Sequence, residues 1–364
     1  MPSSFGPDPP PLFFRGVDVD PPSLKLVLER AIEVGASDFM VRRGIPIFYK
    51  VGGNWYQFSD EFLGETAGYV EELGALGGFA DLPDLLLKEK EIDFSFAVPA
   101  GHRFRINISL TSDGPLVVGR IIRQELPTLE ELGFTEASLQ AIYRALKRKR
   151  GLILVTGVTG SGKSTTLAAM INWLNTHTAS NIITIEDPIE FVFVSQKSAI
   201  HQRELGAHTL SFAKALRSAM RQAPDVILVG EMRDRETVKA ALTAAETGHL
   251  VLSTLHTKSA AETVTRIVDI LPAEDKPQAA QQLASSQSLV ISQKLLPALG
   301  KGRRVLAYEM FVKTDAIQSL IARMEPNIES IVRDVMRSGG VEGMALLEAR
   351  LAALVKEGAT MPEV

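Results

Sequence analysis

The stretch Gly157-Val-Thr-Gly-Ser-Gly-Lys-Ser164 carries residue types and a spacing that suit phosphate chemistry. It has the G-x-x-x-x-G-K-S pattern of a P-loop, and the apolar run Leu152 to Val155 precedes it directly. Its glycines let the backbone fold closely enough for several N–H groups to point at one phosphate, and the positive end of the next helix adds to them. We expect Lys163 to bridge the β- and γ-phosphates of a nucleotide and the Ser164 hydroxyl to ligate Mg²⁺.

The segment after the loop has the pattern of a helix. Leu167, Met170, Ile171 and Leu174 follow one another at i, i+3, i+4 and i+7, which makes one apolar face. A glycine- and serine-rich turn can match the loop pattern by chance, but an apolar strand before it and a helix after it make that explanation a poor one.

Carboxylates follow two later apolar strands. Glu186, Asp187 and Glu190 come after the strand Ile182 to Ile185, and Glu231 comes after the strand Val226 to Val229. Parallel strands end at one edge of a sheet, so these acids are expected beside the P-loop. Glu231 stands one residue beyond the usual Walker B position and is expected to reach Mg²⁺ or water; one of the three other acids is expected to orient the attacking water. The alternative is that they cap helices or face solvent.

Two histidines, His249 and His256, bracket the apolar strand Leu250 to Leu255. Thr254 and His256 are expected at the same sheet edge as the P-loop, where His256 is either a γ-phosphate sensor or a structural residue. The remaining histidines show no spacing typical of metal ligands.

Composition limits the possible classes of protein. The 364 residues carry a net charge of −4 and no cysteine, which excludes disulfides and thiolate zinc sites. No apolar run has the length of a membrane span and no signal peptide is recognisable, so the prediction is a cytoplasmic protein that reaches a membrane through partners. The mild acidity argues against direct nucleic-acid binding. The basic run Lys147-Arg-Lys-Arg150 suits nucleic acid or acidic lipid, or, as the favoured alternative, a solvated helix C-terminus.

The order of patterns predicts four parts. Residues 1–22 contain seven prolines and form a flexible arm. Residues 23–123 place short strands around a helical pair, which is typical of a small antiparallel α+β domain. Residues 124–312 alternate apolar strands with helices and predict an α/β parallel sheet covered on both faces. Residues 313–364 have helical patterns.

Four segments together resemble the secretion ATPases, and are most similar to the PilT-type retraction ATPases of type IV pili. They are Gly157 to Ser164, Ile185-Glu-Asp-Pro-Ile-Glu190, Val229-Gly-Glu-Met-Arg-Asp234 and Thr247-Gly-His-Leu-Val-Leu-Ser-Thr-Leu-His-Thr257. Further likeness extends over about Leu24 to Phe311.

The resemblance implies a PAS-like N-terminal domain, a RecA-like ATPase domain and a homohexameric ring. It implies ATP and Mg²⁺ as cofactors, an inner-membrane pilus platform protein and related pilus ATPases as partners, and a location at the inner membrane through them. Glu190 takes the place of the catalytic glutamate, Glu231 that of an atypical Walker B acid, and His249 and His256 those of the histidine box. The Walker A residues correspond to Gly157, Val158, Thr159, Gly160, Ser161, Gly162, Lys163, Ser164 and Thr165, and Arg105 and Arg120 to arginines that reach the phosphates.

The chain departs from the family pattern at two places, of which the first is a local change and the second bears on retraction. Ala36-Ser-Asp-Phe-Met40 lacks the family's histidine, and Ala316-Ile-Gln-Ser-Leu-Ile-Ala-Arg323 lacks both arginines of the retraction motif. We expect ATP hydrolysis to be intact. Retraction is the leading hypothesis because the chain has no tetracysteine zinc site of the kind common in assembly ATPases. An accessory or regulatory ring subunit and a pilus or secretion assembly ATPase are the alternatives, and a RecA-like nucleic-acid motor is disfavoured.

Overall fold

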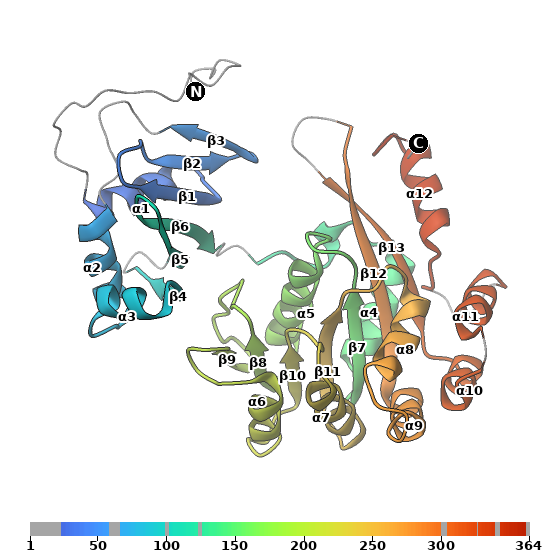
Figure 1. The fold of residues 1–364 in the computed structure, drawn as a ribbon. Coiled ribbons are helices and arrows are strands. Elements are labelled where there is room, and N and C mark those ends of the chain that lie inside the picture. Colours follow the sequence, from blue (N-terminus) through green and yellow to red (C-terminus); the bar gives the residue numbers. More distant parts are fainter. Residues whose placement is uncertain are drawn as a thin grey trace. The chain divides into compact units, whose positions relative to one another are not determined.

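The computed structural model describes residues 23–57, 66–98, 102–122, 126–299, 304–325, 327–338 and 343–361. The chain divides into two compact units, one up to residue 124 and the other from residue 125 (Figure 1). The proline-rich arm predicted over residues 1–22 lies outside the described residues.

The first unit is a six-stranded antiparallel sheet with three helices. Its strand order is β3-β2-β1-β6-β5-β4. The strands are β1 (Asp38–Arg42), β2 (Phe48–Val51), β3 (Asn54–Gln57), β4 (Glu91–Ala97), β5 (Arg103–Thr111) and β6 (Gly114–Ile122), and the helices are α1 (Leu24–Glu33), α2 (Thr66–Gly77) and α3 (Leu82–Glu89). Alternate strand residues and one side of each helix share a single core, in which the buried rings of Phe39 and Phe104 pack edge to face. The α+β architecture predicted for this part is therefore confirmed.

The second unit contains a seven-stranded sheet in the order β13-β12-β7-β11-β10-β8-β9. Its strands are β7 (Gly151–Thr156), β8 (Asn181–Glu186), β9 (Ala199–Glu204), β10 (Val226–Val229), β11 (Leu250–Leu255), β12 (Gln287–Pro297) and β13 (Arg304–Val312). All neighbours are parallel except β13, which runs antiparallel to β12 at the edge. Every residue of β7, β10 and β11 is buried, as expected for strands covered on both faces.

Helices cover both faces of this sheet (Figure 1). One core joins α4 (Glu136–Leu146) and α5 (Lys163–His177) to residues such as Ile153 and Val155 of β7. The other core joins Leu152 and Leu154 to the opposite helices, namely α6 (Phe212–Ala219), α7 (Arg235–Glu246), α8 (Ala260–Asp269) and α9 (Lys276–Ser286). The alternation along β7 assigns each face its own core. The predicted α/β sheet is confirmed.

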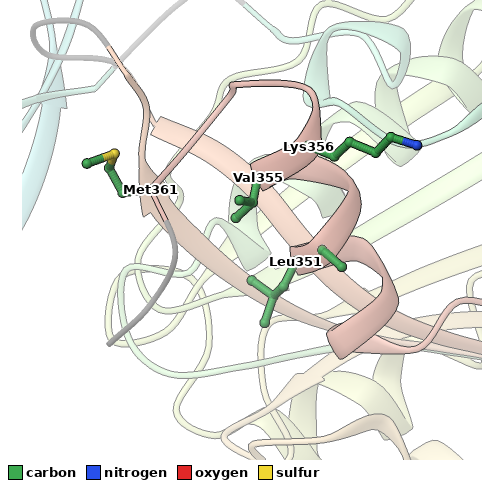
Figure 2. A pocket seen from close by; sticks show the side chains of 5 residues that line it. Leu351, Val355, Lys356 and Met361 are labelled. Atoms are coloured by element: carbon green, nitrogen blue, oxygen red, sulfur yellow. The ribbon is translucent and has the colours of Figure 1, made fainter.

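Three helices end the described chain: α10 (Asp315–Arg323), α11 (Ile328–Arg337) and α12 (Leu347–Lys356). The buried faces of α10 and α11 belong to the same core as α9. Leu354 of α12 packs against β12 and β13, while Leu351, Val355 and Met361 line an apolar pocket of about 430 Å³ (Figure 2). Across the described residues, no helix combines the length and apolar character that a membrane crossing requires.

Several elements differ from the sequence patterns. The sequence also predicts a helix over Leu129 to Leu132 and a strand over Ile45 to Val51. The first is a short 3₁₀ turn (η1, Glu130–Leu132), and the second begins only at Phe48. Pro46, which has no N–H for a strand ladder, precedes that start. The sequence patterns do not predict β9, α8, α9 or the full length of β12. These segments mix polar residues with apolar ones, so their periodicity is weak.

Candidate active site

The P-loop joins β7 to α5 through three glycines with positive φ. The φ angles are 135° at Gly157, 79° at Gly160 and 90° at Gly162, a region that residues with a Cβ rarely adopt. At Gly157 a Cβ atom would also lie only 2.4 Å from the carbonyl oxygen of Gln293. Gly162 is the N-cap of α5, so the loop leads directly into the positive end of that helix.

Polar groups gather on this loop. The Lys163 ammonium donates to the carbonyl oxygens of Gly157 at 2.8 Å and Val158 at 3.2 Å, and Arg304 of β13 donates to Gly160 at 3.4 Å. Ser161 is 1% exposed, and its hydroxyl has no hydrogen-bond partner among the described residues. A buried hydroxyl without a partner is costly in a folded protein. It fits a loop whose remaining partners come from a bound anion.

Two carboxylates from different strands act on the same ammonium. Burial lowers the pKa of Lys163, and the negative charges of Glu231 and Glu190 partly oppose that effect. Glu231 follows β10, and Glu190 follows β8, the neighbouring strand. The structure therefore brings together the P-loop lysine and two of the acids singled out from the sequence.

Glu231 is mostly buried and has two basic neighbours. Its Oε2 atom lies 2.6 Å from Nε of Arg233 and 3.6 Å from Nε2 of His256. Both contacts use the same oxygen, which leaves Oε1 for a metal or water ligand. Gly230 precedes it because β10 ends close to β8: a Cβ at Gly230 would lie 3.2 Å from the carbonyl oxygen of Ile185. This crowding accounts for a glycine at the usual Walker B position.

Two glutamates in the turn after β8, Glu186 and Glu190, differ in their exposure to solvent. Glu186 is half-buried and accepts hydrogen bonds from the Thr184 hydroxyl at 2.6 Å, from Gln202 at 3.2 Å and from the backbone N–H of Glu190. Burial raises the pKa of Glu186 to about 7, although these hydrogen bonds act in the opposite direction. The Glu190 side chain is exposed. Glu186 therefore holds the turn in shape, while Glu190 is accessible to water.

Strand β9 fixes the same turn, a role that the sequence analysis missed. The amide of Gln202 bonds with the backbone of Phe191 at 2.8 Å and of Phe193 at 2.9 Å. The buried Glu204 carboxylate accepts the Ile189 N–H at 3.2 Å. On the other side of the P-loop, Gln293 of β12 donates to the Thr166 hydroxyl at 2.8 Å. No local motif marks these residues, because their partners lie far away in the sequence.

The two histidines lie at opposite ends of β11. His256 follows the strand on the P-loop side, whereas His249 precedes it. The backbone carbonyl oxygen of His249 accepts a hydrogen bond from the N–H of Gly151, the first residue of β7. Its ring Nδ1 contacts the Ala244 carbonyl at 2.9 Å. A strand of six residues spans about 20 Å. The expectation that His249 binds the nucleotide therefore fails for the P-loop of its own chain, since the strand separates them.

Arg105 and Arg120 lie directly opposite each other on β5 and β6 of the first unit. The Nε of Arg120 donates to the buried Asp38 carboxylate at 2.7 Å, and Arg105 lies 3.5 Å from Asp93. Like charges at directly opposed strand positions are unfavourable. Each arginine is therefore held by a carboxylate of a neighbouring strand.

Ser164 and Thr165 occupy the first turn of α5, which completes the predicted loop. A P-loop between a central parallel strand and a helix, with carboxylates at the ends of neighbouring strands, defines a P-loop nucleoside triphosphatase with a RecA-like sheet.

Comparison with known proteins assigns the chain within that class. Residues 90–327 match the family model described as type II/IV secretion system protein. The Pseudomonas aeruginosa protein named type IV pilus retractation ATPase PilT is 50% identical over 89% of this chain and 91% of its own length. A Neisseria gonorrhoeae twitching motility protein is 49% identical over 75% of this chain and 71% of its own.

A solved structure gives the same relationship. The crystal structure of the pilus retraction motor PilT with bound ADP is similar with a TM-score of 0.83 and 41% identity, covering 93% of this chain and 94% of that one. The chain therefore belongs to the type II/IV secretion system protein family, as one of its PilT-type ATPases.

Proposed function

We propose that this chain hydrolyses ATP at the P-loop and, as a homohexameric ring, powers the retraction of type IV pili. The observation that carries the proposal is that the negative charges of Glu190 and Glu231, which follow two neighbouring strands, both act on Lys163 of the P-loop. Such a grouping would supply a phosphate-binding cation, a carboxylate for a metal and a carboxylate for a water at one sheet edge. The relatives named for pilus retraction and twitching motility support the direction of the motor.

Nucleotide binding falls to the backbone of the loop and to Lys163. The N–H groups from Gly157 to Thr165 and the start of α5 favour a polyphosphate. The ammonium, which donates to two loop carbonyls, is positioned to exchange them for β- and γ-phosphate oxygens. Ser161, whose buried hydroxyl has no partner in the described part of the chain, would supply a further donor.

The donor set suits a magnesium ion bound together with the substrate. Mg²⁺ usually takes one or two protein oxygens and completes its shell with phosphates and water. Ser164 Oγ and the free oxygen of Glu231 would hold it, and when bound it would neutralise charge on the phosphates. Across the described residues there is no group of three or more His, Asp or Glu side chains placed to hold a metal ion.

Glu190 is the proposed catalytic base. It is exposed and close enough to Lys163 for their charges to interact, so its carboxylate can accept a proton from a water beside the γ-phosphate. Glu186 is less suitable, because three hydrogen bonds already occupy it. Its part is to position the turn that carries Glu190.

Arg105 and Arg120 are proposed to supply positive charge to the transferred phosphate, as the resemblance implies. Their side-by-side placement on one face supports this role, because it presents two guanidinium groups together, each held in position by its own carboxylate. We further propose that the ring acts on an inner-membrane pilus platform protein, next to related pilus ATPases, from the cytoplasmic side.

A chromosomal deletion tests the direction of the motor. Loss of a retraction ATPase should leave cells with excess surface pili and no twitching, and complementation with the Glu190→Gln chain should not restore motility. Cells without pili would instead identify an assembly ATPase.

Helix α10 favours one alternative, an accessory or regulatory ring subunit. The family's two arginines are replaced by Gln318 and Ala322, and both positions are half-buried on a helix packed against α9. The double variant Gln318→Arg/Ala322→Arg separates the two possibilities. An accessory subunit should gain retraction activity in cells with little change in ATP turnover, whereas a complete motor should gain none.

A further inference from the structure

A cavity of about 580 Å³ lies in the second unit, away from the P-loop. Four cationic side chains line it, together with one carboxylate and three serines; the charged residues are Arg148, Lys149, Arg150, Lys313 and Glu246. Three of the cations belong to the basic run that the sequence analysis assigned to a solvated helix end. The fourth comes from a distant part of the chain.

The cavity lies at the opposite edge of the sheet from the nucleotide site. Its wall includes Gly151, where β7 begins, whereas the P-loop follows Thr156, where β7 ends. The start of β12 and the residue after β13 complete the same edge. Six strand residues separate the two sites by about 20 Å.

The fold holds these cations near one another against their repulsion. The Lys313 ammonium donates to the Ser285 carbonyl oxygen at 2.6 Å, which fixes it in the cavity wall. Burial lowers the pKa of Lys313 and the charges of Arg148 and Arg150 lower it further, while Asp315 in the first turn of α10 opposes them. Among the described residues, none of Arg148, Lys149 and Arg150 forms an ion pair.

Helix ends account for part of this charge. Helices α4, α7 and α9 end here, and each C-terminus carries about half a negative charge. Glu246 adds one more and is itself hydrogen-bonded by Gln282 at 2.7 Å. In the cavity wall four positive side chains therefore face roughly two and a half negative charges, and Asp315 beside Lys313 adds one more. A solvated helix end does not require this surplus.

We propose that this cavity binds a small phosphorylated metabolite that carries at least two negative charges. Arginine forks bind phosphate oxygens in pairs, and the serine hydroxyls add neutral donors. The volume is in the range of small-molecule sites and fits a molecule of nucleotide size. The site does not depend on the proposed motor function, because it shares no side chain with the P-loop.

Calorimetry on the full chain tests the proposal, with one equivalent of ADP and Mg²⁺ per chain so that the P-loop is filled and no excess nucleotide competes for the cavity. Pyrophosphate and AMP are the probes, and thermal shift gives a second reading. We expect saturable binding of one molecule per chain. Arg150→Glu and Lys313→Gln should weaken it by about tenfold or more, because each loses a charged hydrogen bond to phosphate. Stronger binding of AMP identifies a nucleotide, and stronger binding of pyrophosphate identifies the phosphate groups alone.

Lys147→Glu is the matched control. Lys147 belongs to the same exposed basic run but does not line the cavity. Its replacement by glutamate changes the net charge by as much as Arg150→Glu does. The Lys147→Glu variant should bind the probes as the wild type does. If Lys147→Glu and Arg150→Glu weaken probe binding equally, the effect comes from general surface charge, and the proposed site is wrong. Absence of probe binding, with ring dissociation in Arg150→Glu, would make the cavity a contact between copies of the chain.

Discussion

The Nε2 atom of His256 lies 3.6 Å from Oε2 of Glu231. The two residues follow neighbouring parallel strands, β11 and β10, so the sheet itself sets their separation. Arg233 contacts the same carboxylate oxygen at 2.6 Å. The negative charge of Glu231 in turn raises the pKa of Lys163, opposing the effect of burial. The histidine is thereby connected through one carboxylate to the P-loop.

His256→Ala should lower kcat by about 10²-fold while the Kd for ADP changes little. The imidazole can respond to charge that develops on the γ-phosphate, which ADP lacks. Steady-state ATPase assays and ADP titration measure the two quantities. His249→Ala is the control, since that residue lies at the other end of β11 and should keep wild-type turnover. An equal loss in both variants would contradict the role given to His256.

Gly157→Ala should destabilise the protein and abolish turnover. The added Cβ meets the Gln293 carbonyl at 2.4 Å at a φ of 135°, so both crowding and backbone strain apply. We expect a loss of about 2 kcal/mol or more in the free energy of unfolding. Gly160→Ala has a positive φ but no atom within 4 Å of the new Cβ, and should lose only about 1 kcal/mol. Chemical denaturation of both variants tests whether Gly157→Ala loses more stability than Gly160→Ala.

Local patterns in the sequence were enough to predict the parallel sheet, the P-loop and the acids beside it. Short continuous apolar runs that alternate with helical patterns are typical of parallel strands buried on both faces, and such strands end at one edge. The rule that the strands end at one edge also shows that His249 lies away from the P-loop. Because six strand residues separate it from His256, both cannot lie at the phosphate edge.

Other parts of the site depend on pairings that sequence patterns do not reveal. Gln202 and Gln293 act through partners on other elements, and a lone glutamine in a mixed segment has many possible roles. Lys313 joins the basic run only because β13 returns antiparallel to the edge where β7 begins. These relationships are consequences of the topology.

Glu186→Gln should change how stability varies with pH. A carboxyl whose pKa rises from the ordinary 4.5 to about 7 on folding binds more protons in the folded state. Its contribution to stability is therefore full below about pH 4.5 and is lost as the pH rises to about 7. Glutamine stays neutral, so the Tm of the variant relative to wild type should increase between pH 5 and pH 8. A constant difference in Tm would show that Glu186 has no raised pKa.

Glu190→Gln should bind ATP without hydrolysing it, because the amide keeps the size of the side chain and loses the base. Mixed into wild-type chains, it should also reduce the turnover of the remaining chains if they work as one ring. Filter binding and ATPase assays on mixtures measure both. An active Glu190→Gln together with an inactive Glu186→Gln would move the base to Glu186.

The paired arginines Arg105 and Arg120 should act on the rate of the chemical step. Arg105→Ala and Arg120→Ala should each lower kcat by about 10³-fold, as the loss of an arginine finger does in other phosphoryl-transfer enzymes. Nucleotide affinity should change little, because the charge that they neutralise gathers only in the transition state. Arg42→Ala is the control: Arg42 lies in the same sheet and pairs with Asp113 at 3.6 Å, but is not opposed by another arginine.

Asp38→Asn refines this test. The buried Asp38 carboxylate holds Arg120 at 2.7 Å, so the amide should misplace that arginine without removing its charge. Its kcat should fall between those of wild type and Arg120→Ala. The turnover per chain should also rise with protein concentration if a ring is needed. Full activity in both arginine variants, at a rate independent of concentration, would leave an ordinary monomeric P-loop enzyme that completes its site without Arg105 or Arg120.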